Sequence, residues 1–175
     1  PYPGGPHIER LAAAGDPTRV AFPRAWLGDS LDFSFSGLKT AVARFAKLEG
    51  TQVRHEDVAA SLQAAIIEVL VSKTVRAAEI AGVSAVAIGG GVAANRALSA
   101  GMQDACRRNG LRCVAPSAHL CTDNAAMIAA AAYPRWLRGA SDGYELDAMA
   151  TDHLPRVTPS RFEHSPEHEG SPERR

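Results

Sequence analysis

A glycine-rich stretch in the middle of the sequence has the residue types expected of a nucleotide-binding loop. Gly89, Gly90 and Gly91 follow a short apolar run and precede a helical pattern that begins at Asn95. Glycines at the end of a buried strand let a ligand approach the backbone, and the N–H groups at a helix N-terminus can bind phosphate. The stretch matches neither the P-loop nor the dinucleotide fingerprint. It indicates a nucleotide-binding loop or, alternatively, a tight strand-to-helix turn with Asn95 as an ordinary helix cap.

A second stretch, with the sequence CTDNAAM, places Asp123 at the start of an Ala-rich helix. A carboxylate at that position is most often a helix cap or a partner of the helix dipole. Asp123 also follows a predicted strand, however, and the carboxyl ends of parallel strands meet at one edge of a sheet. We therefore expect the glycine loop and the Asp123 loop to line one crevice, where Asp123 could bind a metal ion or lie beside a phosphate.

Other apparent catalytic patterns lack the context that their chemistry needs. A serine nucleophile could use His55 or His119, but no GxSxG turn is present. His164 and His168 have the spacing of a helical metal site, but Pro166 lies between them and would break the helix. The sequence thus favours neither a serine hydrolase nor a helical zinc motif.

The hydrophobic periodicity predicts an α/β fold. Four helical patterns cover residues 36–50, 56–80, 95–109 and 123–137, a shorter one lies near 7–14, and apolar runs at 83–88 and 111–115 read as strands. A strand, a helix and a second strand within so few residues predict a parallel βαβ unit. In the helix at 56–80, the apolar stripe places Glu68, Lys73 and Arg76 on other faces.

These patterns divide the chain into three parts. Residues 1–36 are rich in proline and read as an irregular lead-in, and residues 37–150 read as one α/β lobe. Residues 151–175 contain few large apolar side chains, so we expect a disordered tail.

Composition and charge restrict the class of protein. Lys and Arg number 19, as do Asp and Glu, so the net charge of zero offers no global argument for nucleic-acid binding; a local basic patch would need Lys39, Arg44, Arg96 and Arg107. The sequence lacks an uninterrupted apolar run of the roughly 18 residues of a membrane helix and lacks a signal-peptide pattern. The three cysteines have no CxxC spacing, which argues against a disulfide framework or a structural zinc site. We expect a cytoplasmic protein that does not span a membrane.

Four motifs together resemble one known family. The stretches YPGGP at 2–6, FSFSGLKT at 33–40, GGGVAANR at 89–96 and CTDNAAMIA at 121–129 occur in the order seen in the TsaD family. This family comprises the bacterial tRNA N6-adenosine threonylcarbamoyltransferases, once described as glycoproteases or sialoglycoprotein endopeptidases. The resemblance covers about residues 1–150.

The resemblance implies a fold and a reaction. The fold is that of actin, hexokinase and Hsp70 (ASKHA), with two α/β lobes around a nucleotide cleft. The reaction transfers a threonylcarbamoyl group from threonylcarbamoyl-AMP to N6 of adenosine 37 in tRNAs that read ANN codons, and it releases AMP. TsaB-like and TsaE-like proteins are the implied partners.

The resemblance also assigns site residues by position. Gly5 and Asn95 look like contacts of the substrate nucleotide. The residue types agree on this location, since they independently indicate nucleotide binding at the loop of Gly89, Gly90 and Gly91. Asp123 looks like the carboxylate ligand of a divalent metal ion, iron or zinc. In the family, two histidines of an HxxxH helix in the first lobe complete that metal site, upstream of the YPGGP motif.

Because this sequence begins at the YPGGP motif, we expect it to be the C-terminal half of a TsaD-like enzyme. One carboxylate without the two histidines binds metal weakly, so we expect the isolated chain to be inactive. Because an unpaired lobe exposes its cleft surface, we also expect the chain to self-associate. Two other functions stay open. The chain could be a nonenzymatic nucleotide-binding or interaction module, or a metallopeptidase-like glycoprotease, which is disfavoured because no nucleophile and no complete metal site are apparent.

Overall fold

The computed structural model of the chain describes residues 3–48 and 52–147. The tail expected at 151–175, with His164 and His168, lies outside the described residues. The chain divides into two compact units, residues 1–132 and residues 133–175. The candidate site lies entirely within the first unit, which also holds most of the secondary structure.

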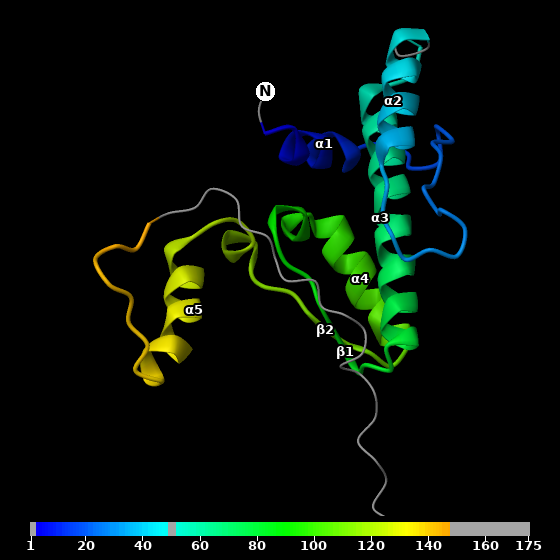
Figure 1. Cartoon of the computed structure of the whole chain (residues 1–175). Coiled ribbons are helices and arrows are strands. Elements are labelled where there is room, and N and C mark those ends of the chain that lie inside the picture. The colour runs from blue at the N-terminus through cyan, green and yellow to red at the C-terminus, as the bar shows by residue number, and fades with distance from the viewer. Residues whose placement is uncertain (1–2, 49–51, 148–175) are drawn as a thin grey trace, which may run out of the picture. The chain divides into compact units, whose positions relative to one another are not determined.

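The centre of the first unit is the long helix α3 (His55–Ile80). Helix α1 (Gly4–Ala12) packs on it through Ala12, Ala59 and Ala60. Helix α2 (Ser36–Leu48) buries Leu38 in a separate cluster that contains Phe22 and Ala65. Figure 1 shows α1 and α4 (Arg96–Arg108) lying against α3, and α2 packs on α3 through the cluster of Leu38 and Ala65. The alanines on α3 let its neighbours approach closely, so α3 serves as the common support of the other elements.

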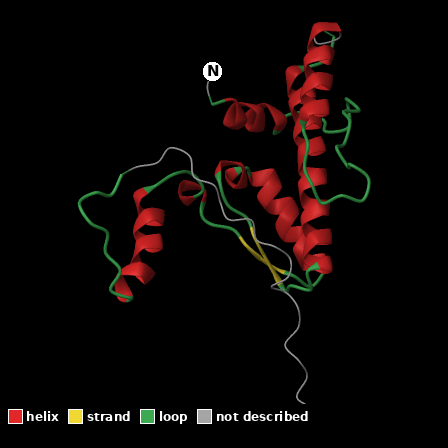
Figure 2. Ribbon diagram, viewed as in Figure 1, coloured by secondary structure: helices red, strands yellow, loops and turns green. Residues whose placement is uncertain are grey.

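A parallel βαβ unit follows α3, which confirms the α/β fold and the parallel pairing expected from the sequence. Strand β1 (Ala85–Ala87) pairs with β2 (Arg112–Val114), with α4 between them in the chain (Figure 2). Both strands are shorter than the apolar runs predicted. One reason is that the N–H of Val83 bonds to the carbonyl of Ala78 at the end of α3, at 3.1 Å, and is therefore lost to the sheet.

The core of the βαβ unit joins α3, β1 and α4 through the buried side chains of Ala78, Val86, Met102 and Cys106. Cys113 of β2 packs against this cluster. All three cysteines are free thiols.

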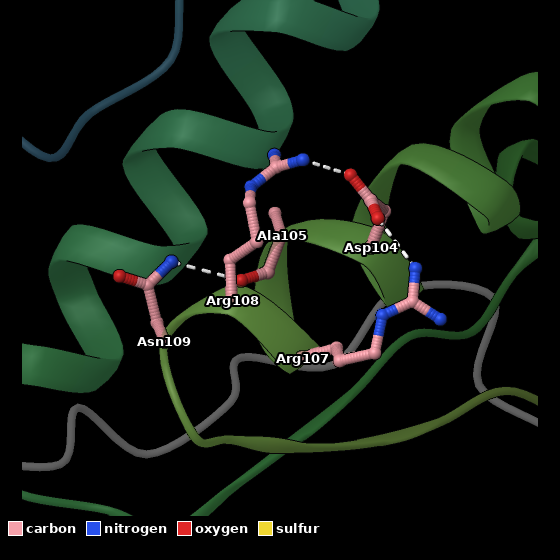
Figure 3. Close-up of polar contacts among 5 residues, drawn as sticks. All are labelled: Asp104, Ala105, Arg107, Arg108 and Asn109. Atoms are coloured by element: carbon pink, nitrogen blue, oxygen red, sulfur yellow. Dashed lines mark hydrogen bonds and ion pairs between the residues drawn. The ribbon is translucent and has the colours of Figure 1, made fainter.

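Helix α4 ends in a set of polar contacts (Figure 3). The guanidinium groups of Arg107 and Arg108 both pair with the carboxylate of Asp104, and Asn109 Nδ2 donates to the carbonyl of Ala105 at 2.8 Å. The hydrogen bond from Arg107 is the main cause that lowers the pKa of Asp104, and the charge of Arg108 adds to it. Gly110 then reverses the chain with φ +67°. Because Arg107 is ion-paired, it contributes less positive charge to the basic patch considered from the sequence.

The lead-in before α2 is held along α3 by buried polar side chains. The fully buried Ser61 accepts a hydrogen bond from the N–H of Val20 at 3.1 Å and donates one to the carbonyl of Asp16 at 3.2 Å. One turn earlier, the carboxylate of Asp57 accepts the N–H of Asp16 at 2.9 Å. An irregular backbone lacks the internal hydrogen bonds of a helix or a strand, so these side chains satisfy groups that would otherwise be unpaired.

The expectation that Lys73 lies on a face of its helix other than the apolar stripe is wrong. Lys73 is 5% exposed, its ammonium donates to the carbonyl of Asp32 at 2.5 Å, and it lies 5.7 Å from the ring centroid of Phe33. Lys73 follows Val69 by four residues and Leu70 by three, so helical spacing puts it on the apolar stripe itself. The lead-in packs on this stripe, and the buried ammonium of Lys73 is accommodated there because it donates to a backbone carbonyl.

By length and composition α3 could cross a membrane, since one window of it reaches a mean hydropathy of 1.5. Core helices of soluble proteins pass the same test, so this finding is weak support for a membrane span. The buried Asp57, Ser61 and Lys73, each bonded to the lead-in, are what a core helix requires.

Candidate nucleotide-binding site

The glycine loop after β1 turns sharply before α4 begins. Gly90 has φ +80° and ψ 171°, a conformation that side-chain-bearing residues rarely adopt. A short 3-10 helix, η1 (Gly91–Ala94), follows, and the side chain of Asn95 then caps α4 by accepting the N–H of Leu98 at 2.9 Å. Asn95 is therefore a true helix cap, and this role does not exclude a second one in ligand binding.

A cavity of about 730 Å³ opens between α1, α3 and the start of α4. Its volume lies within the roughly 300–1,000 Å³ typical of small-molecule sites. Most of its lining is apolar, with Gln63, Glu9, Asn95 and Thr122 as polar side chains. The other lining residues are Pro3, Gly5, Pro6, Ile8, Phe35, Ile66, Ile67, Leu70, Gly91, Val92, Ala94 and Leu98.

The structure brings together three of the nucleotide contacts predicted from the sequence. Gly5, Gly91 and Asn95 line this one cavity although they come from separate parts of the chain. Thr122, next to Asp123, lines it as well, so the glycine loop and the CTDN loop meet there. Gly89 and Gly90 do not line the cavity, and neither does Asp123.

Gly5 and Gly91 have no need to be glycine for the folding of the described residues. Neither has a positive φ, and a Cβ atom built on either would meet no atom within 4 Å. Their lack of a side chain leaves backbone exposed at the cavity wall. This is the arrangement that close approach of a ligand to the backbone requires.

The N-terminus of α4 is not a free phosphate site, contrary to what the sequence indicated. The N–H of Arg96 bonds to the carboxylate of Glu9 at 2.8 Å, and that of Leu98 bonds to Asn95. Glu9 comes from α1, so a side chain remote in sequence supplies the anion that the helix dipole favours. A phosphate would have to displace Glu9 or bind at the glycine loop instead.

Sequence reasoning missed two polar residues of the cavity, Glu9 and Gln63. Gln63 Oε1 accepts a hydrogen bond from Asn95 Nδ2 at 2.8 Å. The available signal was that Gln63 is a polar residue in the predominantly apolar stretch LQAAIIEVL. Glu9 gave no comparable signal because its partner, Arg96, is 87 residues away.

Asp123 is exposed and forms no hydrogen bond or ion pair with the described part of the chain. Helix α5 (Ala125–Leu137) begins two residues later than expected, and Asn124, not Asp123, bonds to the N–H of its first turn, that of Met127, at 3.0 Å. The helix therefore does not need Asp123 as a cap, which leaves its carboxylate available. Within residues 3–48 and 52–147, however, no group of three His, Cys, Asp or Glu side chains could hold a metal ion. The residues present do not form a metal site by themselves.

Comparison with known proteins assigns the chain to a family. The sequence profile of TsaD, tRNA N6-adenosine threonylcarbamoyltransferase, matches residues 1–130. The chain belongs to the TsaD family. This confirms the resemblance inferred from the four motifs.

Curated TsaD-family relatives are about half identical to the chain. The tRNA N6-adenosine threonylcarbamoyltransferase of Halalkalibacterium halodurans is 52% identical over 158 residues, which cover 88% of this chain and 46% of that protein. The protein of the same name from Desulfotalea psychrophila is 50% identical over 145 residues, 79% of this chain and 42% of that protein. The chain thus spans less than half the length of these relatives.

Proposed function

We propose that the chain supplies the nucleotide-binding half of a tRNA N6-adenosine threonylcarbamoyltransferase. In this proposal it is the C-terminal lobe of a two-lobe ASKHA fold. The observation that carries the proposal is the single cavity lined by Gly5, Gly91 and Asn95. Membership of the TsaD family supports the reaction class.

The proposed reaction moves the threonylcarbamoyl group from threonylcarbamoyl-AMP to N6 of adenosine 37 in tRNAs that read ANN codons. The bond between the carbamoyl carbon and the phosphate oxygen breaks, a bond from that carbon to N6 forms, N6 loses a proton, and AMP leaves. The chain would bind the AMP portion in its apolar cavity. There Gly5 and Gly91 would allow close approach, Gly89 and Gly90 would shape the loop, and the Asn95 amide would donate to the ligand.

We further propose Asp123 as one ligand of a divalent metal ion, iron or zinc. Two histidines of an HxxxH helix in the first lobe would complete the site. A single exposed carboxylate does not hold such an ion tightly, because stable sites use three or four protein ligands. A polypeptide of these 175 residues alone should therefore bind nucleotide but not transfer the threonylcarbamoyl group.

The proposed partners follow from the family. They are tRNA, threonylcarbamoyl-AMP, and TsaB-like and TsaE-like proteins, and the proposed location is the cytoplasm. No membrane partner is proposed.

The test is a transfer assay in two parts. The chain is supplied with threonylcarbamoyl-AMP, tRNA and the TsaB-like and TsaE-like proteins, with or without the separately produced first lobe of a relative. The modified adenosine is measured by mass spectrometry of digested tRNA. Asp123→Asn is compared with Asp29→Asn, a control at a carboxylate whose side chain is 99% exposed.

We expect transfer only when the first lobe is present, and loss of transfer in Asp123→Asn but not in Asp29→Asn. Equilibrium binding of AMP should be the same in both variants. Transfer by the chain alone would contradict the half-site proposal, and full activity of Asp123→Asn would remove the metal role. AMP binding without transfer under any condition would favour the nonenzymatic module.

A further inference from the structure

The side-chain amide of Asn95 has a defined orientation because it caps α4. Its Oδ1 accepts the N–H of Leu98 at 2.9 Å, and only the oxygen of an amide can accept. The cap therefore turns Nδ2 away from the helix. This fixes which end of the amide faces α3.

Gln63 of α3 forms a hydrogen bond with Nδ2, the donor end of the Asn95 amide. Its Oε1 accepts a hydrogen from Asn95 Nδ2 at 2.8 Å, and both side chains are partly buried. Nδ2 carries two hydrogens, and the second has no partner within residues 3–48 and 52–147. Asn95 thus presents one unused donor while its two other contacts are satisfied by the protein.

The surroundings of this pair make its geometry important for binding. Gln63 and Asn95 both line the cavity, next to the apolar side chains of Ile66, Ile67 and Leu98. In an apolar environment a hydrogen bond is stronger, and a donor without a partner is more costly, than in water. A donor with a fixed direction in such a cavity selects a ligand with an acceptor at the matching position.

We propose that Gln63 is a positioning residue for nucleotide binding. Its Oε1 holds the amide of Asn95 so that the second Nδ2 hydrogen points to an acceptor of the bound nucleotide. This inference rests on the proposed function, since it takes the nucleotide in the cavity as given. It adds a role for Gln63, which acts on the ligand through Asn95.

Two substitutions of Gln63 separate positioning from direct contact. Gln63→Met removes the acceptor for Asn95 with a side chain of similar length, whereas Gln63→Glu keeps an oxygen acceptor and removes the Nε2 donor. Affinity is measured by calorimetry with AMP and with adenosine. Adenosine is included because the added carboxylate would repel a phosphate but not an uncharged nucleoside.

Two controls accompany these variants. Gln103→Glu makes the same chemical change on the exposed face of α4. Asn95→Ser keeps a side chain that can cap the helix but has no amide donor. Combining Gln63→Met with Asn95→Ser then tests whether Gln63 acts through Asn95, and thermal unfolding shows that each variant is folded.

We expect Gln63→Met to lower adenosine affinity by about tenfold, the effect of one lost hydrogen bond. Gln63→Glu and Gln103→Glu should keep the original affinity for adenosine, and Gln63→Met should have no further effect in the Asn95→Ser background. Unchanged affinity in Gln63→Met would overturn the inference, as would equal losses in both Gln63 variants, which would indicate direct contact through Nε2. If the unmodified chain binds neither AMP nor adenosine, the proposed nucleotide site itself fails.

Discussion

At the scale of single residues, the backbone conformation requires glycine at one position of the candidate site and not at two others. Gly90 is required by its backbone, since φ +80° with ψ 171° is accessible almost only to glycine. Gly5 and Gly91 have ordinary φ angles and open space around Cβ, so the described fold does not require them. At these two positions the absent side chain is compatible with the proposed close approach of a ligand.

Gly90→Ala should lower the free energy of unfolding by about 1–3 kcal/mol, because alanine is strained at this φ and ψ. Gly89→Ala is the matched control, since Gly89 has no positive φ and a Cβ there would meet no atom within 4 Å. Urea unfolding followed by circular dichroism measures both. Equal stability of the two variants would show that the turn adopts another conformation in solution.

The thiol of Cys106 should make the stability of the fold depend on pH. Burial raises the pKa of the Cys106 thiol, and the neighbouring Cys113 raises it further. The folded state therefore favours the neutral thiol. Its stabilising contribution is complete below the pKa of the unfolded thiol, about 8.5, and is lost as the pH rises through the raised pKa of the folded state.

In the unmodified chain, the urea concentration at the midpoint of unfolding should decrease as the pH is raised from about 7 to about 10. This decrease should be smaller in Cys106→Ala. Cys106→Ala also creates a small cavity, so only the slope against pH is compared and not the absolute midpoint. An identical slope in the two proteins would mean that other groups cause the alkaline loss.

At the scale of elements, α3 supports both the lead-in and the cavity. Its Ser61 and Lys73 hold the irregular backbone of the lead-in, while Gln63 and Ile66 line the cavity. The lead-in contributes Phe22 and Phe35 to the cluster with α2 and α3, and Phe35 also lines the cavity. The lead-in is thus folded onto α3 although it lacks helix or strand over most of its length.

Ser61→Ala should lower the free energy of unfolding by about 1–3 kcal/mol, because it leaves the N–H of Val20 and the carbonyl of Asp16 without their partner. Hydrogen exchange at the Val20 amide should become faster. Ser99→Ala, which removes only an exposed bond to Gln103, should change stability by less than about 0.5 kcal/mol. Slow exchange of Val20 in Ser61→Ala would show that another group holds the lead-in.

At the scale of the whole molecule, the chain is short relative to its family and leaves much apolar surface uncovered. No residue of α5 is buried, and Met127, Ile128, Trp136 and Leu137 are each about half exposed or more. These side chains lie around the whole circumference of α5, and a helix that is apolar on all sides is normally covered by other protein segments. We therefore expect the chain to self-associate when no partner covers this helix.

Sedimentation velocity at rising protein concentration should show association of the unmodified chain. Ile128→Lys should weaken it, because a charge replaces an apolar side chain that is 66% exposed. Ala130→Lys adds the same charge on the same helix without removing a large apolar group, so it should have a smaller effect. A monomer at all concentrations would contradict this prediction.

The sequence by itself determined the local elements and the family. Helices α2, α3 and α4 lie within two residues of their predicted bounds, and the parallel pairing of β1 and β2 follows from one βαβ unit. These features depend on periodicity, caps and glycines, which act over a few residues and can be read from the order of the chain.

Only the tertiary structure decided which polar groups meet. The hydrogen bond from Asn95 to Gln63 joins residues 32 positions apart, and that from Arg96 to Glu9 joins residues 87 positions apart. No local sequence pattern predicts either bond. The burial of Lys73 likewise depends on where the lead-in crosses α3. Partners this far apart are set by the path of the whole chain through space, and that path determines both the polar lining of the cavity and the occupied N-terminus of α4.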